Sequence, residues 1–164
     1  MGEPRKLARP LDYGLRVISR RRVSRGELSA RMRRKGYEES DIEETSAKLS
    51  EWGYLDDETF AKDLTGEMLR SRGMGRARAA WELKRKLFDP TVVDNALTEV
   101  YGDTSEEEYA VLAARGYLAK LKGPLSQKER ERLARWLSRR GYGAGAIYHA
   151  LEHAGRADGE PRQR

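Results

Sequence analysis

Cysteine is absent from this 164-residue chain. Its absence excludes a disulfide framework, a thiolate metal site and a cysteine nucleophile. Long apolar runs are also missing, because none approaches the ~18 residues that a membrane span needs and no signal-peptide core follows Met1. We therefore expect a soluble protein of the reducing cytoplasm that has no membrane partner.

Strand-like alternation of apolar and polar residues is also missing, whereas apolar residues recur at helical spacing along most of the chain. This pattern predicts an all-α fold. Several predicted helices begin at a capping serine that is followed three residues later by glutamate, namely Ser24, Ser40, Ser105 and Ser126. The predicted helices cover residues 11–22, 25–35, 41–51, 57–72, 76–87, 90–100, 106–121, 127–140 and 144–154.

One sequence pattern occurs three times. A glycine or leucine followed by an aromatic residue stands at Gly36-Tyr37, Leu87-Phe88 and Gly141-Tyr142, with apolar residues at matching offsets on either side. A period near 50 residues is typical of a supersecondary unit that was copied and that stacks on its neighbours. We expect three tandem three-helix repeats in an elongated molecule. Their predicted bounds are 11–55, 56–103 and 104–155, with a basic arm at 1–10 and a mobile tail at 156–164.

The repeated apolar positions predict one small core in each unit. In the second unit these positions are Leu83, Leu87, Phe88, Val93, Leu97 and Val100. The first unit departs from the pattern at Ser46, which stands where the other units have Leu97 and Leu151. We expect that this part of the first unit has lost an apolar contact, or that it meets solvent or a partner.

Charge is segregated along the chain. Residues 1–35 contain 12 Lys or Arg against 3 Asp or Glu, and residues 36–70 contain 3 against 11. The net charge is +4 over residues 71–90, −6 over 91–114 and +7 over 115–164. Because a solvated helical surface ordinarily mixes its signs, blocks of this size favour contact with a polyanion or with a charged protein partner.

The basic clusters contain the candidate binding residues. A helix dipole stabilises cations near the helix C-terminus by about 0.3–1 kcal/mol each, but the clusters hold more cations than this effect requires. They could contact nucleic-acid phosphate or an acidic protein groove, and the sequence does not separate the two. The candidate residues are Arg20, Arg21, Arg22, Arg25, Arg31, Arg33, Arg34, Lys35, Lys84, Arg85, Lys86, Arg139 and Arg140.

No group of residues predicts catalysis. His149 and His153 fit the H-x-x-E-H zinc-protease pattern, but no third ligand follows them, and we expect no metal site. The glycines around Gly73 and Gly141 lack a GxGxxG or P-loop pattern and follow no strand, so we interpret them as helix connectors. A convergent nucleophile, base and orienting residue is missing. We expect a non-enzymatic protein that uses no cofactor.

The sequence resembles the RecX regulatory proteins in three motifs, which are Ser24-Arg-Gly-Glu-Leu28, Met32-Arg-Arg-Lys-Gly36-Tyr37 and Gly53-Tyr54-Leu55-Asp56-Asp57-Glu58-Thr59-Phe60-Ala61. The likeness is dense over residues 11–61 and continues in register to about residue 155. The sequence departs from the family pattern at Met32, Ser46 and Thr59. Of these departures, Ser46 bears on how tightly the first unit packs.

The resemblance implies a curved, elongated molecule of three tandem three-helix units. It also implies a protein that binds the RecA recombinase filament in its helical groove and restrains strand exchange, ATP turnover and co-protease activity without chemistry of its own. Some members of the family also bind DNA. We therefore expect a monomer that has the RecA filament as its partner in homologous recombination, DNA repair and the SOS response. Direct binding of single- or double-stranded DNA is the second hypothesis, because three-helix units resemble helix-turn-helix folds.

Overall fold

The computed structural model describes residues 7–121 and 125–157, which leaves most of the predicted arm and tail outside the described residues. The described residues form nine α-helices and no strand, which confirms the predicted all-α class. The helices are α1 (Pro10–Ile18), α2 (Arg25–Lys35), α3 (Glu39–Glu51), α4 (Asp57–Arg72), α5 (Arg76–Arg85), α6 (Pro90–Tyr101), α7 (Glu106–Leu118), α8 (Gln127–Arg139) and α9 (Ala144–Ala157).

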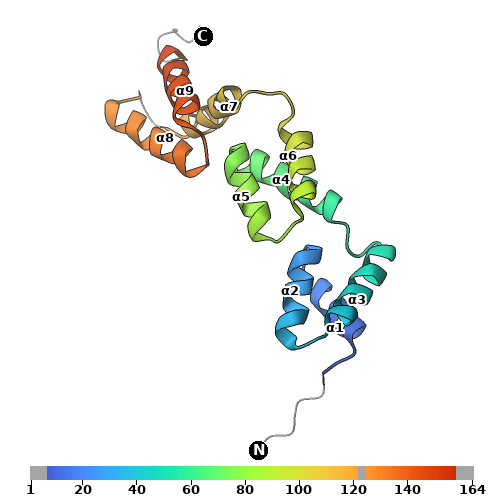
Figure 1. Ribbon diagram of the computed structural model, residues 1–164. Coiled ribbons are helices and arrows are strands. Elements are labelled where there is room, and N and C mark those ends of the chain that lie inside the picture. Colours follow the sequence, from blue (N-terminus) through green and yellow to red (C-terminus); the bar gives the residue numbers. More distant parts are fainter. Residues whose placement is uncertain (1–6, 122–124, 158–164) are drawn as a thin grey trace, which may run out of the picture.

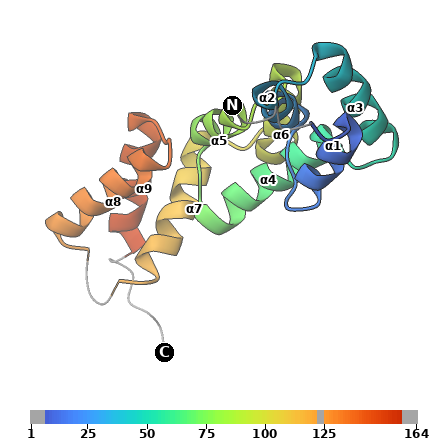
Figure 2. The same ribbon diagram turned by 90° about the horizontal axis from the view of Figure 1, so that it is seen from below.

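The helices form three groups that follow one another along an elongated, bent molecule (Figures 1 and 2). We call α1–α3 the first unit, α4–α6 the second unit and α7–α9 the third unit. The helix pairs with the most extensive packing all lie within one unit. The molecule is thus a tandem array of three-helix units, as predicted, and the regions of contact between neighbouring units are narrow.

Side-chain caps begin most of the helices. The Ser24 hydroxyl accepts a hydrogen bond from the Glu27 N–H at 3.0 Å. Ser105 and Glu108 form a complete capping box at the start of α7, so two orphan backbone donors are satisfied reciprocally. The predicted cap at Ser40 is wrong, because α3 already begins at Glu39 and Ser40 lies within its first turn.

The three anchor positions share one backbone conformation. The φ angles of Gly36, Leu87 and Gly141 are +92°, +57° and +86°, all in the left-handed region that ends a helix. The prediction that Leu87 belongs to the core is wrong, since its side chain is 50% exposed. The physical reason is the end of α5 at Arg85, which comes before the predicted residue 87. The chain reverses at Leu87, and Phe88 is the residue that enters the core.

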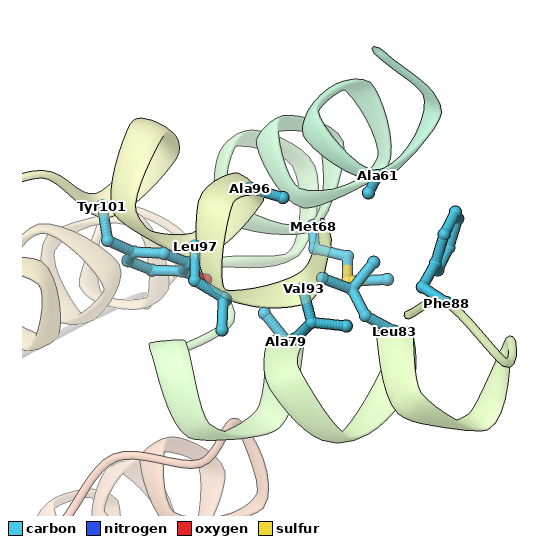
Figure 3. Packing of buried hydrophobic residues seen from close by; sticks show 9 residues of the cluster. All are labelled: Ala61, Met68, Ala79, Leu83, Phe88, Val93, Ala96, Leu97 and Tyr101. Carbon is cyan, nitrogen blue, oxygen red and sulfur yellow. The ribbon is translucent and has the colours of Figure 1, made fainter. Parts of the chain in front are cut away.

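The core of the second unit is built from all three of its helices. Figure 3 shows Met68 of α4 pointing toward Leu83 of α5 and Val93 of α6. Leu83 and Val93 are fully buried, and Phe88 meets Phe60 edge-on with ring centroids 5.3 Å apart. The first and third units each have a separate cluster of buried apolar residues. The predicted arrangement of one small core per unit is therefore present.

Ser46 is buried in the first unit, and its Oγ has no hydrogen-bond partner among the described atoms. Of the alternatives that the sequence left open for this position, exposure to solvent is wrong. Helix α1 approaches α3 closely beside it, because a Cβ atom on Gly14 would stand 2.8 Å from the Thr45 Cγ2 and 3.0 Å from the Leu49 Cδ1. A small residue at position 46 accords with this close approach.

Candidate partner-binding surface

The second helices of the three units lie in a row (Figures 1 and 2). At the first joint the Ser24 hydroxyl, which caps α2, donates a hydrogen bond to the backbone carbonyl of Lys86, just after α5. At the second joint the N–H of Gly75, which precedes α5, donates to the carbonyl of Arg140 after α8 at 2.8 Å. The carboxyl end of one helix thus meets the amino end of the next. We call this arrangement of α8, α5 and α2 the second-helix row.

The first joint brings two of the predicted basic clusters together. Residues 20–22 lie in the turn between α1 and α2, because α1 ends at Ile18 and not at residue 22 as predicted. The bond between Ser24 and Lys86 joins residues 62 positions apart in the sequence. It places the turn and Arg25 next to residues 84–86 at the end of α5.

The carboxyl end of α2 carries the densest cluster. Arg33, Arg34 and Lys35 stand exposed in its last turn, and Arg31 is half-buried. The Arg33 guanidinium donates to the Glu39 carboxylate at 2.9 Å, and this contact raises the pKa of Arg33 and lowers the pKa of Glu39. Within the described part of the chain, Arg31, Arg34 and Lys35 form no ion pair. These three are therefore the unmatched cations at this end.

The second joint carries Arg139 and Arg140, which have different surroundings. The Arg140 guanidinium carbon lies 3.5 Å from the centroid of the Trp136 ring, and its Nε donates to the carbonyl of Arg72 at 2.7 Å. Burial lowers the pKa of Arg140. Arg139 is exposed. The geometry makes Arg140 a link between α8 and the end of α4, whereas Arg139 is accessible to a partner.

Arg22 has a similar linking position between the first two units. Its Nη1 lies 2.8 Å from the carboxylate of Asp63 on α4, and its guanidinium carbon lies 4.6 Å from the centroid of the Phe60 ring. Both charged side chains are more than half exposed. Exposed pairs of this kind contribute only about 0–1 kcal/mol to stability. An acidic group of a partner can therefore replace the Asp63 carboxylate with little loss of free energy.

Two further candidate residues are paired within their own region. Arg21 contacts Glu27 at 3.0 Å, and Arg85 contacts Glu82 at 3.4 Å. The remaining candidates form no ion pair among the residues that the structure describes, and their charges are open to a partner. Apart from Arg140, which donates to the Arg72 carbonyl, these unpaired candidates are Arg20, Arg25, Arg31, Arg34, Lys35, Lys84, Lys86 and Arg139.

Two groups on this surface contain residues that are not among the predicted candidates. Trp81 on α5 is 47% exposed and lies between Arg78 and Arg85, whose guanidinium carbons are 4.3 and 4.7 Å from its ring centroid. Their helical spacing, three residues before and four after the tryptophan, is the signal that indicates such a cluster. The second group lines a groove between the second and third units. Its members lie far apart in the sequence, so no local spacing marks them.

The described residues contain no group of three or more His, Asp or Glu side chains placed to hold a metal ion. His149 and His153 interact within α9, where their ring centroids are 4.2 Å apart and the His153 Nδ1 lies 3.0 Å from the His149 carbonyl. Among the described helices, none is long and apolar enough to cross a membrane.

The sequence matches two models of the RecX family. The model of the first RecX three-helix domain matches residues 11–49, and the model of the second matches residues 56–97. A regulatory protein RecX of Chlorobium limicola is 33% identical over 130 residues, which cover 79% of this chain and 79% of that protein. The chain belongs to the RecX family.

Other members of the family show the same extent of similarity. A regulatory protein RecX of Vibrio parahaemolyticus is 34% identical over 140 residues, which cover 85% of this chain and 88% of that protein. The crystal structure of RecX from Lactobacillus salivarius matches with a TM-score of 0.68 over 88% of this chain and 94% of that one, at 18% identity. It supports the tandem three-helix fold. RecX proteins are regulatory proteins and not enzymes, and the chain is therefore assigned as a non-enzymatic regulatory protein.

Proposed function

We propose that this chain binds the RecA–DNA filament and inhibits its strand exchange, its ATP hydrolysis and its co-protease activity. The protein would act in DNA repair by homologous recombination and in the SOS response. The observation that carries the proposal is the second-helix row, which displays unpaired cations at both joints and at the carboxyl end of α2. The family resemblance supplies RecA as the target.

The spacing of the cations suits a target made of repeated subunits. Helix α5 has 10 residues and is about 15 Å long at 1.5 Å per residue, so the two joints are separated by at least that distance. Each exposed charge contact is weak on its own. Several contacts on one molecule add through effective concentration when the target repeats along its length.

Purified RecA on single-stranded DNA provides the test. We expect ATP hydrolysis and strand exchange to fall as this protein is added, and RecA-stimulated repressor cleavage to fall in parallel. Heat-denatured protein at the same concentration is the control. If none of these three activities changes at saturating protein, the proposal is overturned.

Direct DNA binding is the second candidate function, and the unpaired cations of the second-helix row favour it, since such cations can neutralise backbone phosphates. Salt distinguishes the two candidates. Binding of DNA without RecA falls steeply with salt on a log–log plot. Inhibition that arises from DNA sequestration is relieved by excess single-stranded DNA, whereas inhibition through the filament is not.

A further inference from the structure

A groove of about 760 Å³ lies between the second and third units. Residues from the end of α4, from α7 and from the end of α8 line it. The two units touch within it, because a Cβ atom on Gly73 would stand 3.3 Å from the Cβ of Ala113. Leu112 of α7 also lines the groove and is 55% exposed. The groove therefore presents an open apolar wall to solvent.

The charged residues of the groove have a single sign. Arg70 and Arg72 stand in the last turn of α4, Lys120 follows α7, and Arg140 caps α8. The described lining contains no Asp or Glu, although the chain has 27 of them. The dipole of α4 accounts for part of the preference for arginine at its end. It does not account for the lack of carboxylates on every wall that the described residues form.

None of these four cations has an ion pair among the described residues. Positive potential in a cleft with apolar walls is focused, because the walls have a low dielectric constant. The ligand that fits such a site carries several negative charges and an apolar group.

The aromatic residues of the groove favour a peptide over a nucleic acid. The Arg140 guanidinium covers a face of Trp136 at 3.5 Å, and the Tyr117 ring packs against Trp136 with centroids 5.3 Å apart at 60°. A nucleic-acid base would have to displace Arg140 to stack on that face, and Arg140 also holds the Arg72 carbonyl. An aliphatic or aromatic side chain of a peptide needs only the open wall beside Leu112.

We propose that the groove between the second and third units docks an acidic segment of a partner protein that carries an apolar anchor residue. The anchor lies against Leu112. The carboxylates of the segment meet Arg70 and Arg72 at the end of α4 and Lys120 after α7. This inference goes beyond the proposed function, because docking at the groove requires neither RecA nor DNA.

A binding assay without RecA and without DNA tests the inference. The probe is a fluorescein-labelled dodecapeptide of Asp and Glu with a central Phe-Leu pair, and fluorescence anisotropy reports its affinity. We expect the variant R70E/R72E/K120E to bind at least about tenfold more weakly than the wild type. The control variant R115E/K128E/R135E has the same net charge, and its substitutions lie outside the groove. We expect the affinity of this control variant for the peptide to fall by less than about twofold.

Two further measurements separate the docking mode from general charge attraction. L112S is expected to lower the affinity for the peptide by roughly threefold to tenfold. A peptide with Ser in place of the Phe-Leu pair is expected to bind L112S and the wild type with equal affinity. If the groove variant melts below the wild type, the neutral variant R72Q/K120Q replaces it, with an expected loss of about threefold.

Equal losses in the groove and control variants would overturn the proposal, as would the absence of peptide binding to the wild type. The last measurement uses an oligothymidine with the same net charge as the peptide. If it binds more tightly than the peptide and loses affinity only in the groove variant, the groove is a nucleic-acid site and the peptide proposal is wrong.

Discussion

The backbone carbonyl oxygen of Leu87 lies 2.1 Å from the position that a Cβ atom on Gly26 would occupy. The two residues belong to different units, since Gly26 is in the first turn of α2 and Leu87 follows α5. The first joint of the second-helix row therefore depends on the missing side chain of Gly26. Its second joint has a related contact, where a Cβ atom on Gly141 would stand 2.6 Å from the Cβ of Arg78.

A methyl group at position 26 should open the first joint. We expect Gly26→Ala to lower the free energy of unfolding by about 1–3 kcal/mol, because the atom in the way is backbone and cannot rotate aside. Urea unfolding measures the change. Gly116→Ala is the matched control, since no described atom that could clash lies within 4 Å of its Cβ position in α7. It should be more stable than the wild type by about 0.5–1 kcal/mol, and a loss of similar size in both variants would contradict the prediction.

Removing the Ser46 hydroxyl should stabilise the first unit. The Oγ is buried and has no hydrogen-bond partner among the described residues, so Ser46→Ala relieves a desolvation cost and should raise the free energy of unfolding by about 1 kcal/mol. The matched control is Thr65→Val, because the Thr65 hydroxyl is also buried but donates to the Ala61 carbonyl at 2.7 Å. Chemical denaturation of both variants should give shifts of opposite sign. A destabilised S46A would show that the hydroxyl has a partner in solution.

The unpaired cations at the carboxyl end of α2 should contribute most to the inhibition of RecA. We expect R34E/K35E to raise the concentration needed for half-inhibition of RecA ATP hydrolysis by about tenfold, because charge reversal repels an acidic target. Arg33→Gln should have a smaller effect, since the Arg33 guanidinium is already engaged by Glu39. The variant K128E/R135E has the same net charge as R34E/K35E and serves as control. If R34E/K35E reaches half-inhibition at the same concentration as the wild type, this cluster does not lie in the interface with RecA.

Alkaline pH should test a part-buried hydrogen bond inside the third unit. The Tyr142 hydroxyl donates to the carbonyl of Tyr109 at 3.3 Å, and burial raises the pKa of Tyr142 to about 12. An unfolded tyrosine titrates near pH ~10, so the unfolded chain releases this proton first. The stability that the neutral phenol provides is therefore complete below about pH 10 and is lost as the pH rises toward about 12.

The variant Y142F makes this dependence visible. It should be less stable than the wild type by about 1 kcal/mol near neutral pH, where the lost hydrogen bond is the main difference. The gap between the two proteins should narrow above about pH 10, because the variant has no phenol to ionise at this position. Thermal melts across the alkaline range measure the gap, and a constant difference would show that the Tyr142 pKa is not raised.

Local chemistry made much of the fold predictable. Helix α2 and helix α4 have the predicted bounds because each is marked at both ends, by Ser24 and Gly36 in one case and by Asp56 and Gly73 in the other. Helix α5 ends earlier than predicted, because its stop signal is Leu87 in a left-handed conformation that glycine ordinarily adopts. A leucine at that position reads as a core residue in the sequence.

The candidate surface was predictable only in part. Runs of arginine mark the basic clusters, but whether a given cation is free depends on carboxylates that folding brings to it. Arg22 meets Asp63 from 41 residues away, and Arg140 meets the Arg72 carbonyl from 68 residues away. The groove beside Leu112 is assembled from three helices of two units, and no sequence period encodes it.

The narrow joints have a mechanical consequence. Extensive packing is confined to the interior of each unit, so a pull on the two ends of the molecule passes through the joints in series. A joint should part before any core loosens. By the same logic, small rotations at the two joints let the protein follow a target that twists or lengthens, while each three-helix unit keeps its own shape.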